Sequence, residues 1–127
     1  GTVYNEIMGD IVTFLKKSVA IAESAGIPRE SIVVDPGIGF GKTVSHNLEV
    51  MRRLSELNVL ELPVLLGTSR KSTIGRILDL PEDERLEGTA ATVALGIQAG
   101  VDIVRVHDVR EMARVAKMAD AIVRGVN

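Results

Sequence analysis

The sequence predicts a parallel β/α fold, because one pattern occurs three times along the chain. Each copy has a short apolar run, then a loop with glycine or charged residues, and then apolar residues at helical spacing. The runs end at Val34, Leu66 and Val106, which lie about 32 and 40 residues apart, the size of a β-α unit. Right-handed crossovers between parallel strands would place the three loops at one carboxyl-end face.

The length of the chain limits this fold to part of a barrel. A complete (β/α)8 barrel needs roughly 250 residues, whereas this chain has 127. A small open doubly wound sheet is the alternative. The chain does not begin with Met, and a helical pattern precedes the first strand, so we expect a piece of a longer protein. Residues 1–127 are interpreted as one partial barrel domain.

The composition indicates a packed, globular domain. Hydrophobic residues make up 46% of the chain and charged residues 25%, with a net charge of −2. One Tyr, two Phe and no basic stripe offer little to nucleic acid, and no apolar run approaches the roughly 20 residues that span a bilayer. We therefore expect neither nucleic acid nor a membrane as a partner. The absence of cysteine leaves no disulfide, zinc thiolate site or catalytic thiol, and it fits a cytoplasmic location.

The first β-α unit is preceded by a long helix. Apolar residues at steps of three and four predict an amphipathic helix over Tyr4–Ala25, with Gly26 closing it in the left-handed conformation. Ile32–Val34 predict a short strand. A second helix follows the glycine loop, with Ser45 as its N-cap and an apolar stripe that continues to Leu57.

The second unit begins with Pro63–Gly67, which is apolar on both faces and so indicates a strand in a buried parallel sheet. A short apolar segment, Ile74–Leu78, follows its loop. A longer helix is predicted from Pro81, a residue suited to the first helical position, to about Ala99. Gly88 and Gly96 lower the helix propensity of this segment and suggest close packing against a neighbour.

The third unit closes the chain. Ile103–Val106 predict a strand, and Asp108 with Glu111 predicts a capping box at the start of the last helix. The apolar stripe of that helix is Met112, Ala116, Ala119 and Val123.

The loop at 35–42, Asp-Pro-Gly-Ile-Gly-Phe-Gly-Lys, is the first candidate site. Its three glycines permit sharp turns or a close approach of a ligand, and Asp35 places a carboxylate at the end of a strand. A phosphate-binding P-loop would need a glycine where Pro36 stands, and proline has no N–H for phosphate. A tight turn with glycines for steric reasons is a better alternative, but it does not account for Asp35.

The second strand is followed by Ser69, Arg70, Lys71 and Ser72, which taken alone are typical of a solvated loop. His46 lies at the start of a predicted helix with no partner evident in the sequence, and we interpret it as a surface residue.

Arg105 and His107 lie at the end of the third strand. They lie two residues apart, so their side chains share one face, which in a parallel barrel is the interior mouth. An arginine there needs an anion. The alternative is that Arg105 pairs with a carboxylate such as Asp35, while His107 helps to cap the last helix. The spacing of histidines and carboxylates predicts no metal site within this chain.

Together the three loops resemble those of bacterial dihydropteroate synthase. The motifs that carry the resemblance are DPGIGFGK at 35–42, LGTSRKS at 66–72 and RVHD at 105–108. Members of that family are (β/α)8 barrels, and the resemblance implies that this chain is the C-terminal half, with the last three strands and their helices. It implies condensation of 6-hydroxymethyl-7,8-dihydropterin diphosphate with p-aminobenzoate in folate biosynthesis, inhibition by sulfonamides, and a homodimer or higher self-association.

The resemblance also implies roles for individual residues. Asp35 would accept hydrogen bonds from the pterin edge, and Lys71 would donate to the pterin ring between the two substrates. Arg105 would stack on the pterin and, with His107, donate to the departing diphosphate. Lys71, Arg105 and His107 are thus the expected catalytic residues.

Three further residues would shape the substrate pockets. Phe40 and Ser72 would line the p-aminobenzoate pocket, and Gly67 would let its loop approach the pterin. The resemblance implies a Mg²⁺ cofactor, whose ligands would come mostly from the N-terminal half.

Two other functions fit parts of the pattern. A pterin-dependent methyltransferase would keep an acid such as Asp35 but would not need Arg70, Lys71 and Ser72. A non-catalytic, self-associating half-barrel is the second alternative, because a sheet of three strands has two open edges and an uncovered apolar face. Because the N-terminal half is absent, we expect the 127-residue chain alone to be oligomeric or domain-swapped and to have little or no synthase activity.

Overall fold

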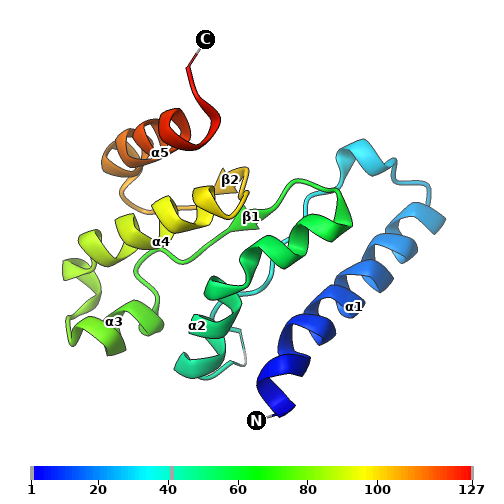
Figure 1. Ribbon diagram of the computed structural model, residues 1–127, viewed down its shortest axis with the longest axis horizontal. Helices are drawn as coiled ribbons and strands as arrows, with labels where there is room; N and C mark the ends of the chain where they lie inside the picture. The colour runs from blue at the N-terminus through cyan, green and yellow to red at the C-terminus, as the bar shows by residue number, and fades with distance from the viewer. Residues whose placement is uncertain (1, 41, 127) are drawn as a thin grey trace.

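The computed structural model of the chain describes residues 2–40 and 42–126. Helices alternate with short parallel strands, and Figure 1 shows the strands near the middle of the molecule, with α1 and α5 on different sides of them. The elements are α1 (Thr2–Ser24), η1 (Arg29–Ser31), α2 (Val44–Arg52), η2 (Leu54–Leu60), β1 (Leu65–Leu66), α3 (Ser72–Leu78), η3 (Glu82–Glu84), α4 (Leu86–Gln98), β2 (Ile103–Val104) and α5 (Val109–Arg124).

The three predicted strands are parallel and adjacent in chain order. An isolated parallel bridge joins Val34 to Val64, and β1 pairs with β2 in the register Leu65 with Ile103 and Leu66 with Val104. The predicted parallel arrangement is therefore confirmed, but the predicted strand lengths are wrong. The first strand is reduced to one bridge because its outer edge has no neighbouring strand, and the sequence cannot show which neighbours a strand will have.

The first helix is as predicted, and its apolar stripe builds the larger core. Met8, Leu15 and Val19 are buried in one cluster that also contains the strand residues Val34 and Leu66. The chain leaves the helix through Gly26, which has a φ of +94° and so takes the left-handed conformation that glycine favours.

The second helix is shorter than predicted. Thr43, not Ser45, is its N-cap, and the Thr43 side chain accepts a hydrogen bond from the backbone N–H of His46. The helix ends at Arg52, and the remaining leucines of the predicted stripe lie in η2. Leu54, Leu57 and Leu60 are buried there, and their three-residue spacing matches the period of a 3₁₀ helix.

The predicted helix from Pro81 is split into η3 and α4. The side chain of Arg85, at the junction, donates to the backbone carbonyls of Leu80 and Arg70. The close packing expected at Gly88 and Gly96 is confirmed. A Cβ atom at Gly96 would lie 2.6 Å from Leu66 Cδ2, and one at Gly88 would clash with Ile74.

The last helix packs on α4 and forms a second core of Val93, Ile97 and Met112. The predicted capping box is wrong. Asp108 precedes α5 without a side-chain capping bond, because its carboxylate forms an ion pair with Arg70 instead. The ion pair thus ties the loop before α5 to the loop after β1.

The strands expose the face that turns away from this packing. Val34, Val64 and Leu66 are buried, whereas Val33 and Ile103 are 44% and 41% exposed. Since side chains alternate between the faces of a strand, Val33 and Ile103 mark the face that a complete barrel would enclose. This is the face on which the candidate site is built.

Candidate functional site

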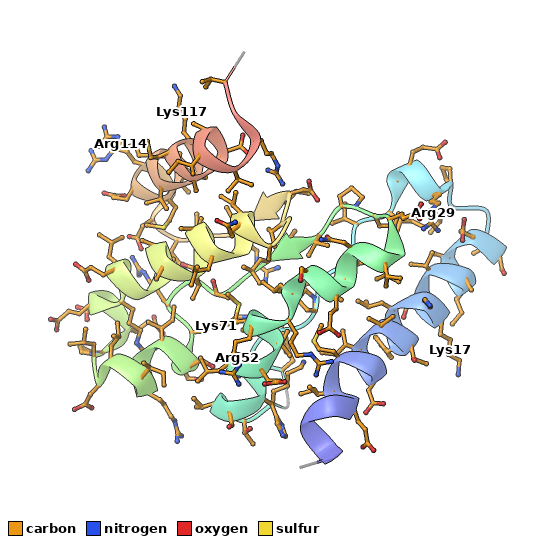
Figure 2. All side chains as sticks on the ribbon, viewed as in Figure 1. Lys17, Arg29, Arg52, Lys71, Arg114 and Lys117 are labelled. Atoms are coloured by element: carbon orange, nitrogen blue, oxygen red, sulfur yellow. The ribbon has the colours of Figure 1, made fainter. Side chains whose placement is uncertain are left out.

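The loops after the three apolar runs meet at one end of the strands. The register pairs Val34 with Val64 and Leu65 with Ile103, so residues with numbers of equal parity lie on one face of the strands. The face of the exposed Val33 and Ile103 is therefore also that of Asp35, Gly67, Arg105 and His107. Figure 2 shows Lys71 in the central part of the molecule, whereas Lys17, Arg29, Arg114 and Lys117 lie at its periphery. Hydrogen bonds of Lys71 with Ile38 and of Ser69 with His107 join the three loops, so the prediction that the loops converge is confirmed.

The glycine loop turns back on itself at Asp35. The Asp35 Oδ1 atom accepts a hydrogen bond of 2.7 Å from the backbone N–H of Gly37. Gly37 and Gly39 have φ values of +74° and +91°, a region that L side chains rarely adopt, while Gly41 lies outside the described residues. The carboxylate is thus fixed in orientation by its own loop.

Lys42 closes this loop. Its Nζ atom donates a 2.8 Å hydrogen bond to the Gly37 carbonyl. Burial lowers the pKa of Lys42, and the nearby Asp35 carboxylate partly opposes this. A P-loop lysine would point at phosphate, so this arrangement supports the glycine-turn interpretation.

Lys71 joins the second loop to the first. Its Nζ atom donates a 2.6 Å hydrogen bond to the Ile38 carbonyl and lies 4.8 Å from the centre of the Phe40 ring. Burial, and then the positive charge of Arg105, lower the pKa of Lys71, while Asp35 opposes the shift. The ammonium group therefore lies among the side chains of all three loops.

Arg105 lies over Gly67. A Cβ atom at Gly67 would be 2.6 Å from Arg105 Nη2, so the absence of a side chain at position 67 makes room for the guanidinium group. The alternative pairing of Arg105 with Asp35 is not found, since no ion pair among residues 2–40 and 42–126 involves Arg105. Arg105 is exposed and lines an open pocket, so its positive charge is accessible at the surface.

His107 is held by Ser69. The Ser69 Oγ atom lies 2.7 Å from His107 Nδ1 and accepts a 3.1 Å hydrogen bond from the backbone N–H of His107. The imidazole is thus tied to the second loop and does not cap α5, contrary to the alternative. Gly67, Ser69, Lys71, Arg105, Val106 and His107 line an open pocket of about 200 Å³.

Phe40 and Ser72 lie on the surface beside this pocket. Phe40 is 70% exposed, and Ser72 is exposed at the first position of α3, directly after Lys71. His46, predicted to lie on the surface, is partly buried near the start of α2.

Arg70 has a structural task that its sequence position did not reveal. Its φ is +57°, and its guanidinium group bonds both carboxylate oxygens of Asp108, at 2.8 and 3.3 Å. Its backbone N–H donates to Thr89 Oγ1, and its carbonyl accepts from Arg85. These contacts hold a backbone conformation that costs energy in a residue other than glycine, immediately before Lys71.

Sequence reasoning also missed Asn47. This residue is 2% exposed, and its side chain links the glycine loop to α3. The signal that could have revealed it is a polar amide within the otherwise apolar stripe of a helix, since a buried amide needs partners.

The described residues include no cluster of metal-ligating side chains. Among residues 2–40 and 42–126, no group of three or more His, Cys, Asp or Glu side chains has a suitable arrangement. The carboxylate of Asp108, beside the pocket, is already paired with Arg70. Hydrogen bonds from Arg70, together with its positive charge, lower the pKa of that carboxyl group.

In the same part of the chain, no helix is long and apolar enough to cross a membrane.

A comparison with protein families decides where this chain belongs. Residues 2–107 match the family described as pterin binding enzyme. The chain belongs to the pterin-binding enzyme family.

The relatives of this pterin-binding chain are longer than it is. It is 57% identical over 119 residues to dihydropteroate synthase from Bacillus subtilis, covering 94% of this chain and 42% of that protein. It is 38% identical over 118 residues to dihydropteroate synthase from Escherichia coli, covering 93% and 42%. The chain thus spans less than half the length of these relatives.

Solved structures of relatives confirm the partial α/β barrel that the sequence predicted. The Clostridium difficile dihydropteroate synthase determined in the presence of pteroic acid superposes with a TM-score of 0.92 at 57% identity, over 93% of this chain and 45% of that one. The Yersinia pestis dihydropteroate synthase in complex with a sulfonamide drug gives a TM-score of 0.91 at 37% identity, over 94% and 44%.

Proposed function

We propose that the protein carrying this chain is a dihydropteroate synthase and that this chain supplies the strand-end loops of its active site. The reaction joins 6-hydroxymethyl-7,8-dihydropterin diphosphate to p-aminobenzoate and releases diphosphate. The observation that carries the proposal is the convergence of Asp35, Lys71 and Arg105 on one face of the strands. Relatives named for this activity support it.

Pterin recognition is assigned to Asp35. A carboxylate is an acceptor with two oxygens, and the edge of a pterin ring presents an amino group and a ring N–H side by side. The Gly37 N–H already orients one oxygen of Asp35. The remaining lone pairs can accept from the pterin with little loss of conformational entropy.

Stabilisation of diphosphate is assigned to Arg105 and His107. The carbon–oxygen bond of the pterin methylene breaks and its electron pair leaves with diphosphate, so negative charge grows there. Arg105 can meet that charge because it has no carboxylate partner among the described residues. The hydroxyl of Ser69 can donate to His107 Nδ1, which would leave Nε2–H as a donor for the anion.

The second substrate is assigned to the surface beside Lys71. The aniline nitrogen of p-aminobenzoate forms the new carbon–nitrogen bond and then loses a proton to solvent water. Phe40 supplies an exposed aromatic face, and Ser72 an exposed hydroxyl, near Lys71. Lys71 would leave the Ile38 carbonyl and donate to the pterin ring between the two substrates.

Several expectations for the complete protein remain predictions. Its Mg²⁺ would be held mainly by residues outside this chain, and no step above depends on it. A homodimer would use α4 and α5, where Leu95, Met118 and Ile122 are more than 60% exposed (65%, 64% and 71%). A cytoplasmic location is predicted from the cysteine-free sequence.

A chimera tests the proposed function. This chain would replace the matching 119-residue segment of the Bacillus subtilis relative, and the purified chimera would receive both substrates. We expect equal amounts of dihydropteroate and diphosphate, with turnover reduced by about 100-fold or more in Lys71→Ala, since one active-site donor is lost. A folded chimera that makes neither product would refute the proposal.

A further inference from the structure

Asn47 is the polar link between two parts of the candidate site. It lies in α2 and is 2% exposed, yet both ends of its amide are bonded. Its Oδ1 atom accepts a 2.9 Å hydrogen bond from the backbone N–H of Gly39. Its Nδ2 atom donates a 3.0 Å hydrogen bond to the hydroxyl of Thr73, which is 8% exposed.

These two bonds connect the glycine loop to the start of α3. Gly39 lies between Ile38 and Phe40 in the sequence. The Ile38 carbonyl accepts a hydrogen bond from the Lys71 ammonium group, and the Phe40 ring faces the same group. Thr73 lies two residues after Lys71, in the first turn of α3. Asn47 therefore links these two segments on their buried side, and Lys71 links the same two segments at the surface.

The surroundings of Asn47 make this geometry specific. Apolar side chains, among them Ile38, Leu48, Met51 and Ile74, line a cavity of about 190 Å³ beside it. An amide in such a place is costly unless both its donor and its acceptor are used. Displacement of the loop or of α3 would leave one end of the amide without a partner.

We propose that Asn47 is a positioning residue that holds the glycine loop against α3. When Lys71 releases the Ile38 carbonyl to donate to a substrate, the bonds of Asn47 keep Gly39 and Phe40 in place. The inference rests on the proposed function, because the substrate at this surface would be p-aminobenzoate. Asp35 is oriented within its own loop by Gly37, so pterin binding depends less on Asn47.

The test uses the chimera with Asn47→Leu, which removes both bonds, and Thr73→Val, which removes one. Thr73→Ser keeps the hydroxyl and is the matched control for Thr73→Val. Asn58→Leu is the control for Asn47→Leu, because Asn58 bonds the Ala99 carbonyl away from the site.

The first readout is hydrogen–deuterium exchange in the segment that contains Gly39 and Phe40. The loss of one or two hydrogen bonds predicts exchange about tenfold faster in Asn47→Leu, a smaller increase in Thr73→Val, and no change in Thr73→Ser. The second readout is kinetic. The KM for p-aminobenzoate should rise about tenfold in Asn47→Leu, while the KM for the pterin diphosphate stays within about twofold.

Wild-type exchange in Thr73→Val together with an unchanged KM for p-aminobenzoate would overturn the inference. Equal increases in both KM values would also overturn it, because they would indicate general loosening of the fold. If Asn47→Leu does not fold, Thr73→Val against Thr73→Ser decides the question. A wild-type chimera without synthase activity would refute the proposed function, whereas the exchange measurement would still show whether Asn47 holds the loop.

Discussion

Position 67 shows how one residue can serve a site by having no side chain. Gly67 does not have a positive φ, so its backbone would accept alanine, but a Cβ atom there would lie 2.6 Å from Arg105 Nη2. Because the clash is with the flexible end of a side chain, Arg105 would move and the fold would remain. Gly67→Ala in the chimera should change the free energy of unfolding by less than about 1 kcal/mol.

The same substitution should raise the KM for the pterin diphosphate about tenfold, since the displaced guanidinium group no longer lies over position 67. Gly9→Ala is the matched control, because nothing lies within 4 Å of a Cβ atom at Gly9 in α1. Steady-state kinetics and urea unfolding of both variants are the measurements. A normal KM in a Gly67→Ala variant that folds would contradict the role given to Arg105.

Lys71 should make stability depend on pH in alkaline solution. Burial and Arg105 lower its pKa from the ordinary value of 10.5, so the folded state binds this proton less tightly than the unfolded chain does. The penalty for the charged form is present below the folded pKa and disappears as the pH rises toward 10.5. The wild-type chimera should therefore gain stability relative to Lys71→Met over that range, as measured by urea unfolding at successive pH values. A constant difference would show that the ammonium group is not destabilised by its surroundings.

At the scale of elements, the loop after β1 is tied to the loop after β2 by Arg70 and Asp108. Hydrogen bonds from Arg70 lower the pKa of Asp108 below its ordinary value of 3.8. The stabilisation is present above pH 3.8 and is lost as the pH falls through the lower folded pKa. The stability advantage of the wild-type chimera over Asp108→Asn should therefore shrink in that acidic range. Urea unfolding at several pH values tests this, and an advantage that is unchanged at low pH would contradict it.

Helices were predictable from sequence better than strands were. Periodic apolar residues reveal a helix because its hydrogen bonds lie within one segment, as in α1 with Met8, Leu15 and Val19. A strand depends on partners elsewhere in the chain, and Val34 forms a bridge with Val64 alone. The capping box at Asp108 was wrong for a related reason: Arg70, 38 residues away in sequence, competes for the same carboxylate.

Sequence patterns predicted which candidate residues share one face of the strands, but not the contacts that link them. Alternation along the strands placed Arg105 and His107 on one face. The tie between His107 and Ser69, the position of Arg105 over Gly67, and the two bonds of Asn47 all join residues that are distant in sequence. Such contacts follow from the packing of whole elements, which a local pattern does not contain.

At the scale of the whole molecule, this chain has one covered and one uncovered face of strands. Val33 and Ile103 are exposed on the face that a barrel would enclose, and in the described part of the chain no further strand pairs beyond the Val34 bridge or beyond β2. Exposed apolar faces and open strand edges favour association. The 127-residue chain alone should therefore self-associate in sedimentation velocity experiments and show little or no synthase activity.

In the chimera, the rest of the barrel covers the same face. The chimera should therefore not show the concentration-dependent self-association that we expect of the chain alone. A monomeric chain with full synthase activity would contradict this account of the exposed face.

The central claim is that these strand-end loops form the pterin-recognising part of an active site. Titration calorimetry of the chimera with pteroic acid, for wild type and Asp35→Asn, tests it most directly. The amide presents a donor where the pterin edge also donates, so we expect binding by the wild type and an affinity at least about tenfold lower in the variant. Equal affinities in two folded proteins would contradict the claim.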